Sequence, residues 1–270
     1  MLINKFAKII LKALGVLFVL VLIIIFYSVY IERFNTQIQY TKINLGFEKR
    51  FILISDLHLG KFKDASYLAL VVKKINSVEN VDAVLIAGDF VYKQDNTKLS
   101  EYFKPLSEIR YPTFAVVGNH DVLGSAADMK NQIVEVLESN KVNVLTNETL
   151  DFENIQIVGL GDRYVGNNHS TILNTLTIED KVLVLAHNPD SVRDYLSLDN
   201  VDLTLAGHTH CGQIRLPILY KMILHVENND GIQFDKGYYK SHKLFITCGL
   251  GEFGIPARLF NPPTIDVLDL

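Results

Sequence analysis

The sequence has few cysteines, no basic block and no repetitive or low-complexity tract. Its two cysteines, Cys211 and Cys248, are too few for a disulfide framework and lack paired metal-ligand spacing, so they say little about redox compartment. Lys and Arg number 26 against 30 Asp and Glu, and no basic run offers a surface for neutralising phosphates, so we expect no nucleic acid polymer as a partner. With 49% apolar and 21% charged residues, the 270-residue chain is neither disordered nor fibrous.

Apolar residues are concentrated near the N-terminus. Residues 13–30 carry no charged side chain, and a helix of that length spans about 27 Å, close to the hydrocarbon thickness of a bilayer. The charges before this run are all basic, and Tyr27 and Tyr30 stand where interfacial aromatic residues gather. The pattern predicts a basic leader over residues 1–12 and a retained transmembrane anchor over residues 13–31, with a cleaved secretory signal as the alternative.

The charges that flank the span predict its orientation. The basic leader favours an N-terminus inside the cytoplasm, which places the rest of the chain outside it. Arg33, Lys42, Lys49 and Arg50 follow the span and partly offset this signal. We therefore expect a single-pass membrane protein whose main domain lies outside the cytoplasm.

After the anchor, short apolar runs alternate with helical periodicity over residues 67–75 and 129–137. This alternation is typical of an α/β fold. The buried strands are expected at Phe51–Ile54, Ala83–Ala87, Thr113–Val117, Val182–Ala186 and Leu203–Ala206. Further strands, several of them antiparallel, are expected at Val142–Leu145, Ile155–Gly159, Leu244–Thr247 and Ile265–Leu268. A connector over residues 32–50 holds a predicted edge strand within Gln37–Leu45, and residues 51–270 form one domain.

Polar side chains follow five of the predicted strands at the point where each ends. Ligands of open α/β sheets collect beyond the carboxyl ends of strands. Gly, Asn and Asp are common at the ends of strands because turns favour them, but turns do not favour histidine, and five histidines are present here. A mixed set of carboxylate, amide and imidazole suits two divalent cations such as Mn, Fe or Zn, and such a pair stabilises the attacking and leaving oxygens of a phosphoryl displacement. The residues are Asp56, His58, Asp89, Asn119, His120, Asp121, His187, His208 and His210.

In this order, these residues resemble the signature blocks of the calcineurin-like metallophosphoesterases. The blocks are Asp56-x-His58, Gly88-Asp89, Gly118-Asn119-His120-Asp121, His187 and Gly207-His208-x-His210. The strings LAHNPD, AGHTHCGQIRLP and GLGEFGIPARLFNPPTI are similar to the bacterial membrane-anchored phosphodiesterase branch, and the resemblance covers residues 51–270. It implies a four-layer α-β-β-α sandwich with a dinuclear metal site.

The resemblance also implies roles for the residues. His120 would donate a proton to the leaving group or contact the phosphate, and Asp89 would bridge two divalent metal ions, most favourably Mn, with Fe or Zn also suitable. The implied reaction is attack of a metal-bridging hydroxide on a phosphodiester or diphosphate. The other implied ligands are Asp56, His58 and His210 for one metal, and Asn119, His187 and His208 for the other.

Two positions depart from the family pattern. Tyr92 stands three residues after Asp89, where many relatives carry an Asp that orients the histidine of the Asn-His block. A phenol cannot stabilise an imidazolium as a carboxylate does, so Asp121 is the alternative orienter of His120, and a leaving group of low pKa is favoured. Cys211 replaces a common Gly and is interpreted as a tolerated small residue rather than a thiolate ligand.

Three arginines, Arg163, Arg215 and Arg258, are candidate phosphate or headgroup clamps, because Arg binds such groups bidentately. Each is also compatible with a solvated surface charge.

The leading hypothesis is a membrane-anchored dinuclear-metal phosphohydrolase. Its substrate would be a UDP-linked acylated sugar if the domain faces the cytoplasm, or an envelope phosphodiester if it faces outward. The alternative is a catalytically silent binding module of the same fold, tethered to the membrane. A structural single-metal site would leave several ligands without purpose.

Overall fold

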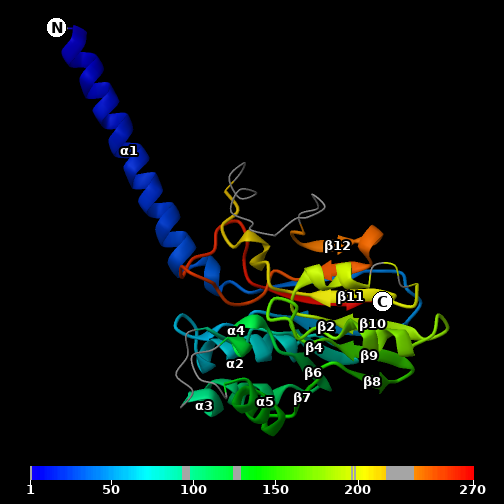
Figure 1. Cartoon of the computed structure of the whole chain (residues 1–270). Coiled ribbons are helices and arrows are strands. Elements are labelled where there is room, and N and C mark those ends of the chain that lie inside the picture. The colour runs from blue at the N-terminus through cyan, green and yellow to red at the C-terminus, as the bar shows by residue number, and fades with distance from the viewer. Residues whose placement is uncertain (1, 93–97, 124–128, 196, 198, 217–233) are drawn as a thin grey trace.

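A single long helix precedes the folded part of the chain. The computed structural model describes residues 2–92, 98–123, 129–195, 197, 199–216 and 234–270. Helix α1 (Leu2–Tyr30) projects away from the rest of the protein, and the N-terminus lies at its far end (Figure 1). Its most apolar stretch has a mean hydropathy of 3.2 and is not buried against the protein, so it is long and apolar enough to cross a membrane. The predicted leader and anchor therefore form one continuous helix.

Two six-stranded sheets carry the predicted strands. The first has the order β1-β14-β2-β4-β6-β7, and the second β12-β13-β11-β10-β9-β8. The first contains β1 (Gln37–Lys42), β14 (Thr264–Asp269), β2 (Arg50–Ile54), β4 (Ala83–Ala87), β6 (Thr113–Val116) and β7 (Val142–Val144). The second contains β12 (Gly237–Tyr239), β13 (Leu244–Ile246), β11 (Leu203–Ala206), β10 (Lys181–Leu185), β9 (Ile155–Gly159) and β8 (Glu148–Phe152). A short parallel ladder joins β3 (Leu59–Gly60) to β5 (Val91–Tyr92).

The sheets and helices form four layers, as predicted. Alternate residues of β2 face opposite sides of the sheet. Phe51 packs in the core between the two sheets, and Ile52 packs in the core between the first sheet and the helices. The first sheet is covered by α2 (Ala65–Ile75), α3 (Leu99–Phe103) and α5 (Met129–Ser139). The second sheet is covered by the 3₁₀ segments η4 (Ser170–Thr175) and η5 (Pro189–Asp194).

The edge strand and the mixed sheet direction were also predicted correctly. Strand β1 lies at the edge of the first sheet and runs parallel to β14. Strand β14 runs antiparallel to β2, and β9 and β13 each have an antiparallel neighbour, β8 and β12. Strand β7, in contrast, runs parallel to β6.

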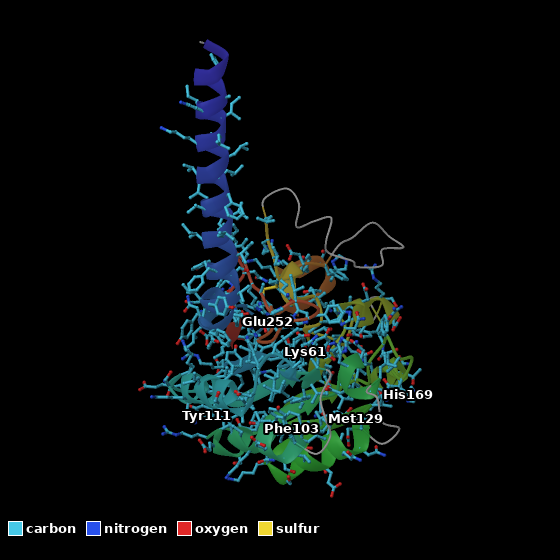
Figure 2. All side chains as sticks on the ribbon, turned by 90° about the vertical axis from the view of Figure 1, so that its left-hand side faces the viewer. Lys61, Phe103, Tyr111, Met129, His169 and Glu252 are labelled. Atoms are coloured by element: carbon cyan, nitrogen blue, oxygen red, sulfur yellow. A yellow bond between two sulfur atoms is a disulfide. The ribbon has the colours of Figure 1, made fainter. Side chains whose placement is uncertain are left out.

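The residues directly after α1 are part of the domain rather than a free connector. In η1 (Glu32–Phe34), the Glu32 carboxylate accepts a hydrogen bond from the Asn261 backbone N–H at 2.6 Å. The Arg33 guanidinium lies 3.0 Å from the Glu252 carboxylate, which also pairs with Lys63 at 2.9 Å. Glu252 is fully buried and lies at the foot of α1 (Figure 2). The segment after the helix is therefore anchored into the fold by buried charges.

Candidate metal centre

The predicted ligands lie at the carboxyl ends of strands from both sheets. Asp56 and His58 follow β2, Asp89 follows β4, and the Asn119 block follows β6 in the first sheet. The remaining histidines follow β10 and β11 in the second sheet. Because the two sheets pack face to face, these strand ends meet at one edge of the sandwich.

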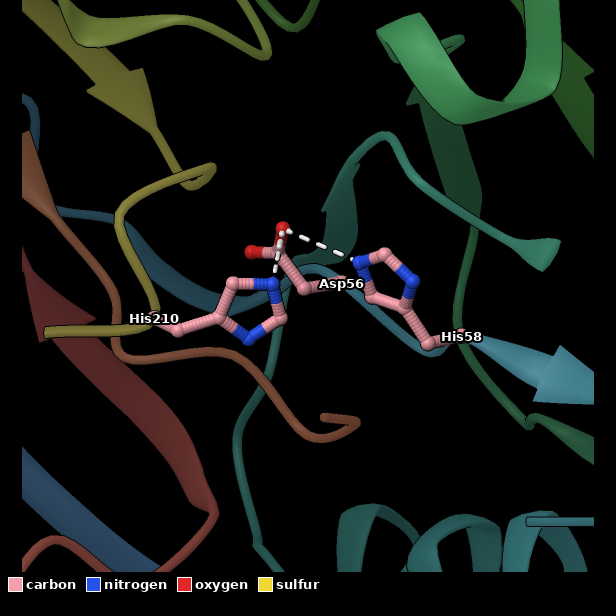
Figure 3. Close-up of side chains that lie close together, drawn as sticks. All are labelled: Asp56, His58 and His210. Atoms are coloured by element: carbon pink, nitrogen blue, oxygen red, sulfur yellow. Dashed lines mark ion pairs between the residues drawn. The ribbon is translucent and has the colours of Figure 1, made fainter. Parts of the chain in front are cut away.

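One group of ligands consists of Asp56, His58 and His210. Figure 3 shows the carboxylate of Asp56 between the two imidazole rings. Its Oδ1 lies 3.5 Å from Nε2 of His210 and 3.8 Å from Nε2 of His58. All three side chains are buried, and their ligand atoms lie close enough together to hold one metal ion.

A second group surrounds His187. Its Nε2 lies 3.1 Å from Oδ1 of Asn119, 3.0 Å from Nδ1 of His208 and 3.3 Å from Oδ2 of Asp89. The other ring nitrogen, Nδ1, is 2.7 Å from the carbonyl of Ala87. Donation to this carbonyl holds the ring in the tautomer that directs the Nε2 lone pair into the cluster, as is common for metal-binding histidines.

Asp89 joins the two groups. The same oxygen, Oδ2, lies 3.3 Å from Nε2 of His58 and 3.3 Å from Nε2 of His187. A carboxylate in this position can serve two cations at once. The structure therefore brings together all seven residues that were predicted as ligands.

Buried polar atoms without partners indicate that the site fits positive charge. Oδ1 of Asp56, both ring nitrogens of His58 and Nδ1 of His210 are buried without a hydrogen-bond partner. Burial lowers the pKa of His210 to about 3, so its ring is neutral. Burial acts in the same direction on His58, but the carboxylates of Asp56 and Asp89 outweigh it and raise the pKa to about 9. Unpaired buried polar atoms are costly, and cations would satisfy them and displace the proton of His58.

The backbone at the ligands adopts an unusual conformation. Five of the seven predicted ligands have φ in the left-handed region, which non-glycine residues enter at a cost of about 1–3 kcal/mol each. Backbone strain of this kind often clusters at functional sites. The five residues are Asp56 (50°), His58 (45°), Asp89 (56°), His208 (69°) and His210 (48°).

Two glycines allow the ligand loops to approach one another. A Cβ at Gly207 would lie 2.7 Å from Oδ2 of Asp56, and a Cβ at Gly118 would lie 2.8 Å from Cγ of Asp89. Real Cβ atoms do not approach other atoms so closely. The glycines of these blocks are therefore required by packing against the carboxylates.

His120 lies beside the ligands, among aromatic rings. It is in α4 (Asn119–Val122), and its backbone N–H donates to Oδ1 of Asp89 at 2.9 Å. The ring is half-buried, and its centroid lies 5.1 Å from that of His58, 5.5 Å from that of Tyr92 and 5.3 Å from that of Phe253. Burial lowers the pKa of His120, more than the charge of Asp89 raises it.

Asp121 has a different position from the one considered for an orienter of His120. Its carboxylate accepts hydrogen bonds from the backbone N–H groups of Phe90, Val91 and Gly118, at 2.8, 3.2 and 2.9 Å. These contacts fasten the loop after β6 to the loop after β4. Asp121 therefore holds two ligand loops together, a role that sequence reasoning missed.

The three candidate arginine clamps have protein partners. Arg258 is fully buried, and its guanidinium donates to backbone carbonyls, including those of Cys248 at 3.0 Å and Asn261 at 3.2 Å. The prediction of a substrate clamp at Arg258 is therefore wrong, because its donors hold the C-terminal loop. Arg163 pairs with the carboxylate of Asp194, and Arg215 with that of Asp235. Whether either of these two contacts substrate stays a prediction.

The two cysteines form a disulfide. Cys211, the residue after His210, is bonded to Cys248, with their Cα atoms 4.9 Å apart. The interpretation of Cys211 as a tolerated small residue was therefore wrong. The alternative, a thiolate ligand at Cys211, is excluded as well, because its sulfur is part of the disulfide. The bond ties the loop after β11 to the loop after β13, next to a predicted metal ligand.

Comparison with known proteins agrees with this geometry. The family profile described as calcineurin-like phosphoesterase matches residues 49–212. The chain belongs to this family. It is 30% identical to an uncharacterised metallophosphoesterase of Campylobacter jejuni over 84% of this chain and 60% of that protein, so it spans well under the full length of that relative. It is 29% identical to the phosphodiesterase YaeI of Escherichia coli, covering 82% of each chain. It is also 28% identical to a transmembrane protein with metallophosphoesterase domain of Danio rerio, over 78% of this chain and 50% of that protein.

Proposed function

We propose that this calcineurin-like phosphoesterase is a membrane-anchored, metal-dependent phosphohydrolase that cleaves a phosphodiester or diphosphate bond. The observation that carries the proposal is the position of Asp89, whose Oδ2 lies 3.3 Å from a ring nitrogen of both His58 and His187. A carboxylate shared by two cations requires such a position. Manganese is the most favoured metal, and iron or zinc also suit the mixed oxygen and nitrogen ligands.

Each residue of the centre has a proposed part. When bound, the cations would activate water and neutralise the phosphate oxygens. His120 would donate a proton to the leaving oxygen or contact the phosphate. Because Tyr92 rather than a carboxylate neighbours His120, we favour substrates whose leaving group needs little acid assistance, such as a diphosphate. The proposed ligands are Asp56, His58, His210 and Asp89 for one cation, and Asn119, His187, His208 and Asp89 for the other.

The test uses the full-length protein in detergent micelles. Metal content and hydrolysis of bis-p-nitrophenyl phosphate are measured, with about two metal ions expected per chain. Asp89→Asn and His208→Ala should lose metal and activity together. Asp151→Asn and His169→Ala change exposed residues of the same types outside the site and should retain both.

Two outcomes would count against the proposal. Full metal loading and normal turnover in Asp89→Asn would remove Asp89 from the centre. Two bound metal ions without hydrolysis of any phosphodiester or diphosphate would favour the alternative, a silent binding module tethered to the membrane.

We further propose that residues 13–31 anchor the chain and that the domain lies outside the cytoplasm. The disulfide between Cys211 and Cys248 supports this orientation, because disulfides persist in oxidising compartments and are rare in the cytosol. An outward domain favours an envelope phosphodiester over a cytoplasmic UDP-linked acylated sugar, and the preference for a leaving group that needs little acid assistance then applies among envelope substrates. Protease added to intact spheroplasts should digest the domain, and complete protection would reverse the orientation and the preferred substrate.

A further inference from the structure

The loop over residues 253–260 lies level with the last turn of α1. The backbone N–H of Arg258 donates to the carbonyl of Ser28 at 3.2 Å, and the Ser28 side chain is buried. Ser28 lies inside the charge-free run of the helix, two residues before its end at Tyr30. Figure 1 shows the chain between β13 and β14 passing the foot of α1. If α1 spans a bilayer, this loop lies at the bilayer surface.

The side chains that the loop exposes are large and apolar. Phe253, Ile255 and Phe260 are 52%, 52% and 62% exposed, and we call these three residues the apolar rim. Tyr30 and Ile31, at the end of the helix, are exposed as well. Exposed large apolar side chains that come from one loop and from the adjoining helix end are typical of a site of protein or membrane contact. Since the helix beside the rim already enters lipid, the occupant that fits this surface is the bilayer itself.

The apolar rim is firmly connected to the candidate metal centre. The side chain of Gln213, three residues after His210, accepts from the Phe253 backbone N–H at 2.8 Å and donates to the Ile255 carbonyl at 3.0 Å. The Phe253 ring lies 5.3 Å from the ring of His120. The loop that reaches the level of the bilayer therefore also borders the metal centre.

We propose that the apolar rim enters the headgroup region of the bilayer and holds the metal centre at the membrane surface, where it acts on lipid-borne phosphoesters in preference to soluble ones. A lipid substrate then keeps its acyl chains in the bilayer while its phosphate reaches the centre. The substrate preference rests on the proposed function. Insertion of the rim rests on the proposed membrane anchor, but not on the proposed hydrolysis.

Insertion is tested by fluorescence, because the sequence contains no tryptophan. Phe260→Trp places a single fluorophore in the rim of the full-length protein, reconstituted in vesicles of phosphatidylcholine and phosphatidylglycerol. Lipids brominated near the headgroup should quench its emission strongly. The control is Ile178→Trp, at a residue 78% exposed near the start of β10, the end of that strand away from the site, and it should stay unquenched. Absent quenching for Phe260→Trp, or equal quenching for both variants, would overturn the inference.

Substrate preference is tested with two diesters that share a leaving group. Hexadecyl p-nitrophenyl phosphate partitions into the vesicles, whereas bis-p-nitrophenyl phosphate stays in solution. Ile255→Ser combined with Phe260→Ser, which spares the His120 neighbour Phe253, should lower kcat/KM about tenfold for the alkyl diester and less than about twofold for the soluble one. Ile178→Ser should change neither.

The outcomes separate this inference from the proposed function. Equal loss on both diesters, or no loss on either, would overturn the preference for lipid-borne substrates. A wild-type protein that carries metal but hydrolyses neither diester would overturn the proposed function, and the quenching experiment would still decide whether the rim inserts.

Discussion

Replacing Arg33 by alanine is expected to destabilise the domain, although this residue lies only three positions after the end of the long helix. Its guanidinium lies 3.0 Å from the carboxylate of Glu252, which is fully buried, and also donates to the Phe62 carbonyl at 2.8 Å. Removing one partner of a buried ion pair costs about 3–5 kcal/mol. Because Glu252 keeps Lys63 at 2.9 Å, we expect the lower end, about 3 kcal/mol.

Arg163→Ala is a matched control for this prediction. The Arg163 guanidinium also lies 3.0 Å from a carboxylate, that of Asp194. These two side chains are 41% and 32% exposed, whereas those of Arg33 and Glu252 are 8% and 0% exposed. An exposed ion pair contributes at most about 1 kcal/mol, so only the buried pair should matter.

The assay is thermal unfolding of the full-length variants in one detergent, followed by near-ultraviolet circular dichroism. A change of 1 kcal/mol shifts the Tm of a domain of this size by roughly 2–4 °C, so Arg33→Ala should lower it by about 6–12 °C and Arg163→Ala by less than about 4 °C. Adding Glu252→Gln to Arg33→Ala should lower the Tm further rather than restore it, because the fully buried Lys63 then loses its carboxylate partner as well. Equal shifts from the two arginine variants would refute the reasoning that burial determines the cost.

Three further predictions concern buried groups. Burial raises the pKa of Asp266 from 3.8 to about 6, so its ionisation opposes folding as the pH rises between these values. In urea titrations, Asp266→Asn should therefore be more stable than wild type by about 3 kcal/mol above pH 6, and the two proteins should be equally stable below about pH 4. A difference that does not change with pH would contradict a raised pKa for Asp266. Asp121→Ala removes the acceptor of three backbone N–H groups and should cost about 3 kcal/mol or more by thermal unfolding, and an unchanged Tm would show that those donors find another partner. A soluble fragment that begins at Asn35 lacks Glu32 and Arg33 and should melt below one that begins at Glu32, with equal Tm values excluding a structural role for both residues.

The fold is predictable from the sequence where buried strands are short, continuous apolar runs. Phe51–Ile54 and Ala83–Ala87 are of this kind, and the polar residues that follow such runs mark the edge of the sandwich at which the site lies. Strands β3 and β5 have two residues each, too few for a visible pattern. Strand β8 (Glu148–Phe152) is mostly polar, so its pairing with β9 follows from the sheet and not from its own residues.

The structure brings together the residues predicted for the site. The contacts that hold these residues in place, however, cannot be predicted from sequence patterns. Cys211 and Cys248 are 37 residues apart, and nothing in that separation indicates pairing. From its sequence context alone, Arg258 could be a phosphate clamp. Its role is decided by its burial, which the neighbouring residues in the sequence do not indicate. The burial of Glu32 and Arg33 was missed for the same reason, since charged residues after a membrane span are usually solvated.

The left-handed backbone at five predicted ligands has a consequence for the evolution of this chain. An L-residue in that conformation is disfavoured by about 1–3 kcal/mol, whereas glycine enters it freely. A duplicated gene copy released from catalysis would therefore relieve this strain by accepting glycine at such positions, most readily at the partly buried His208, where the lost side chain leaves the smallest cavity. Drift at these positions, ahead of drift in the buried strands, would mark descendants that keep the sandwich after their chemistry is gone.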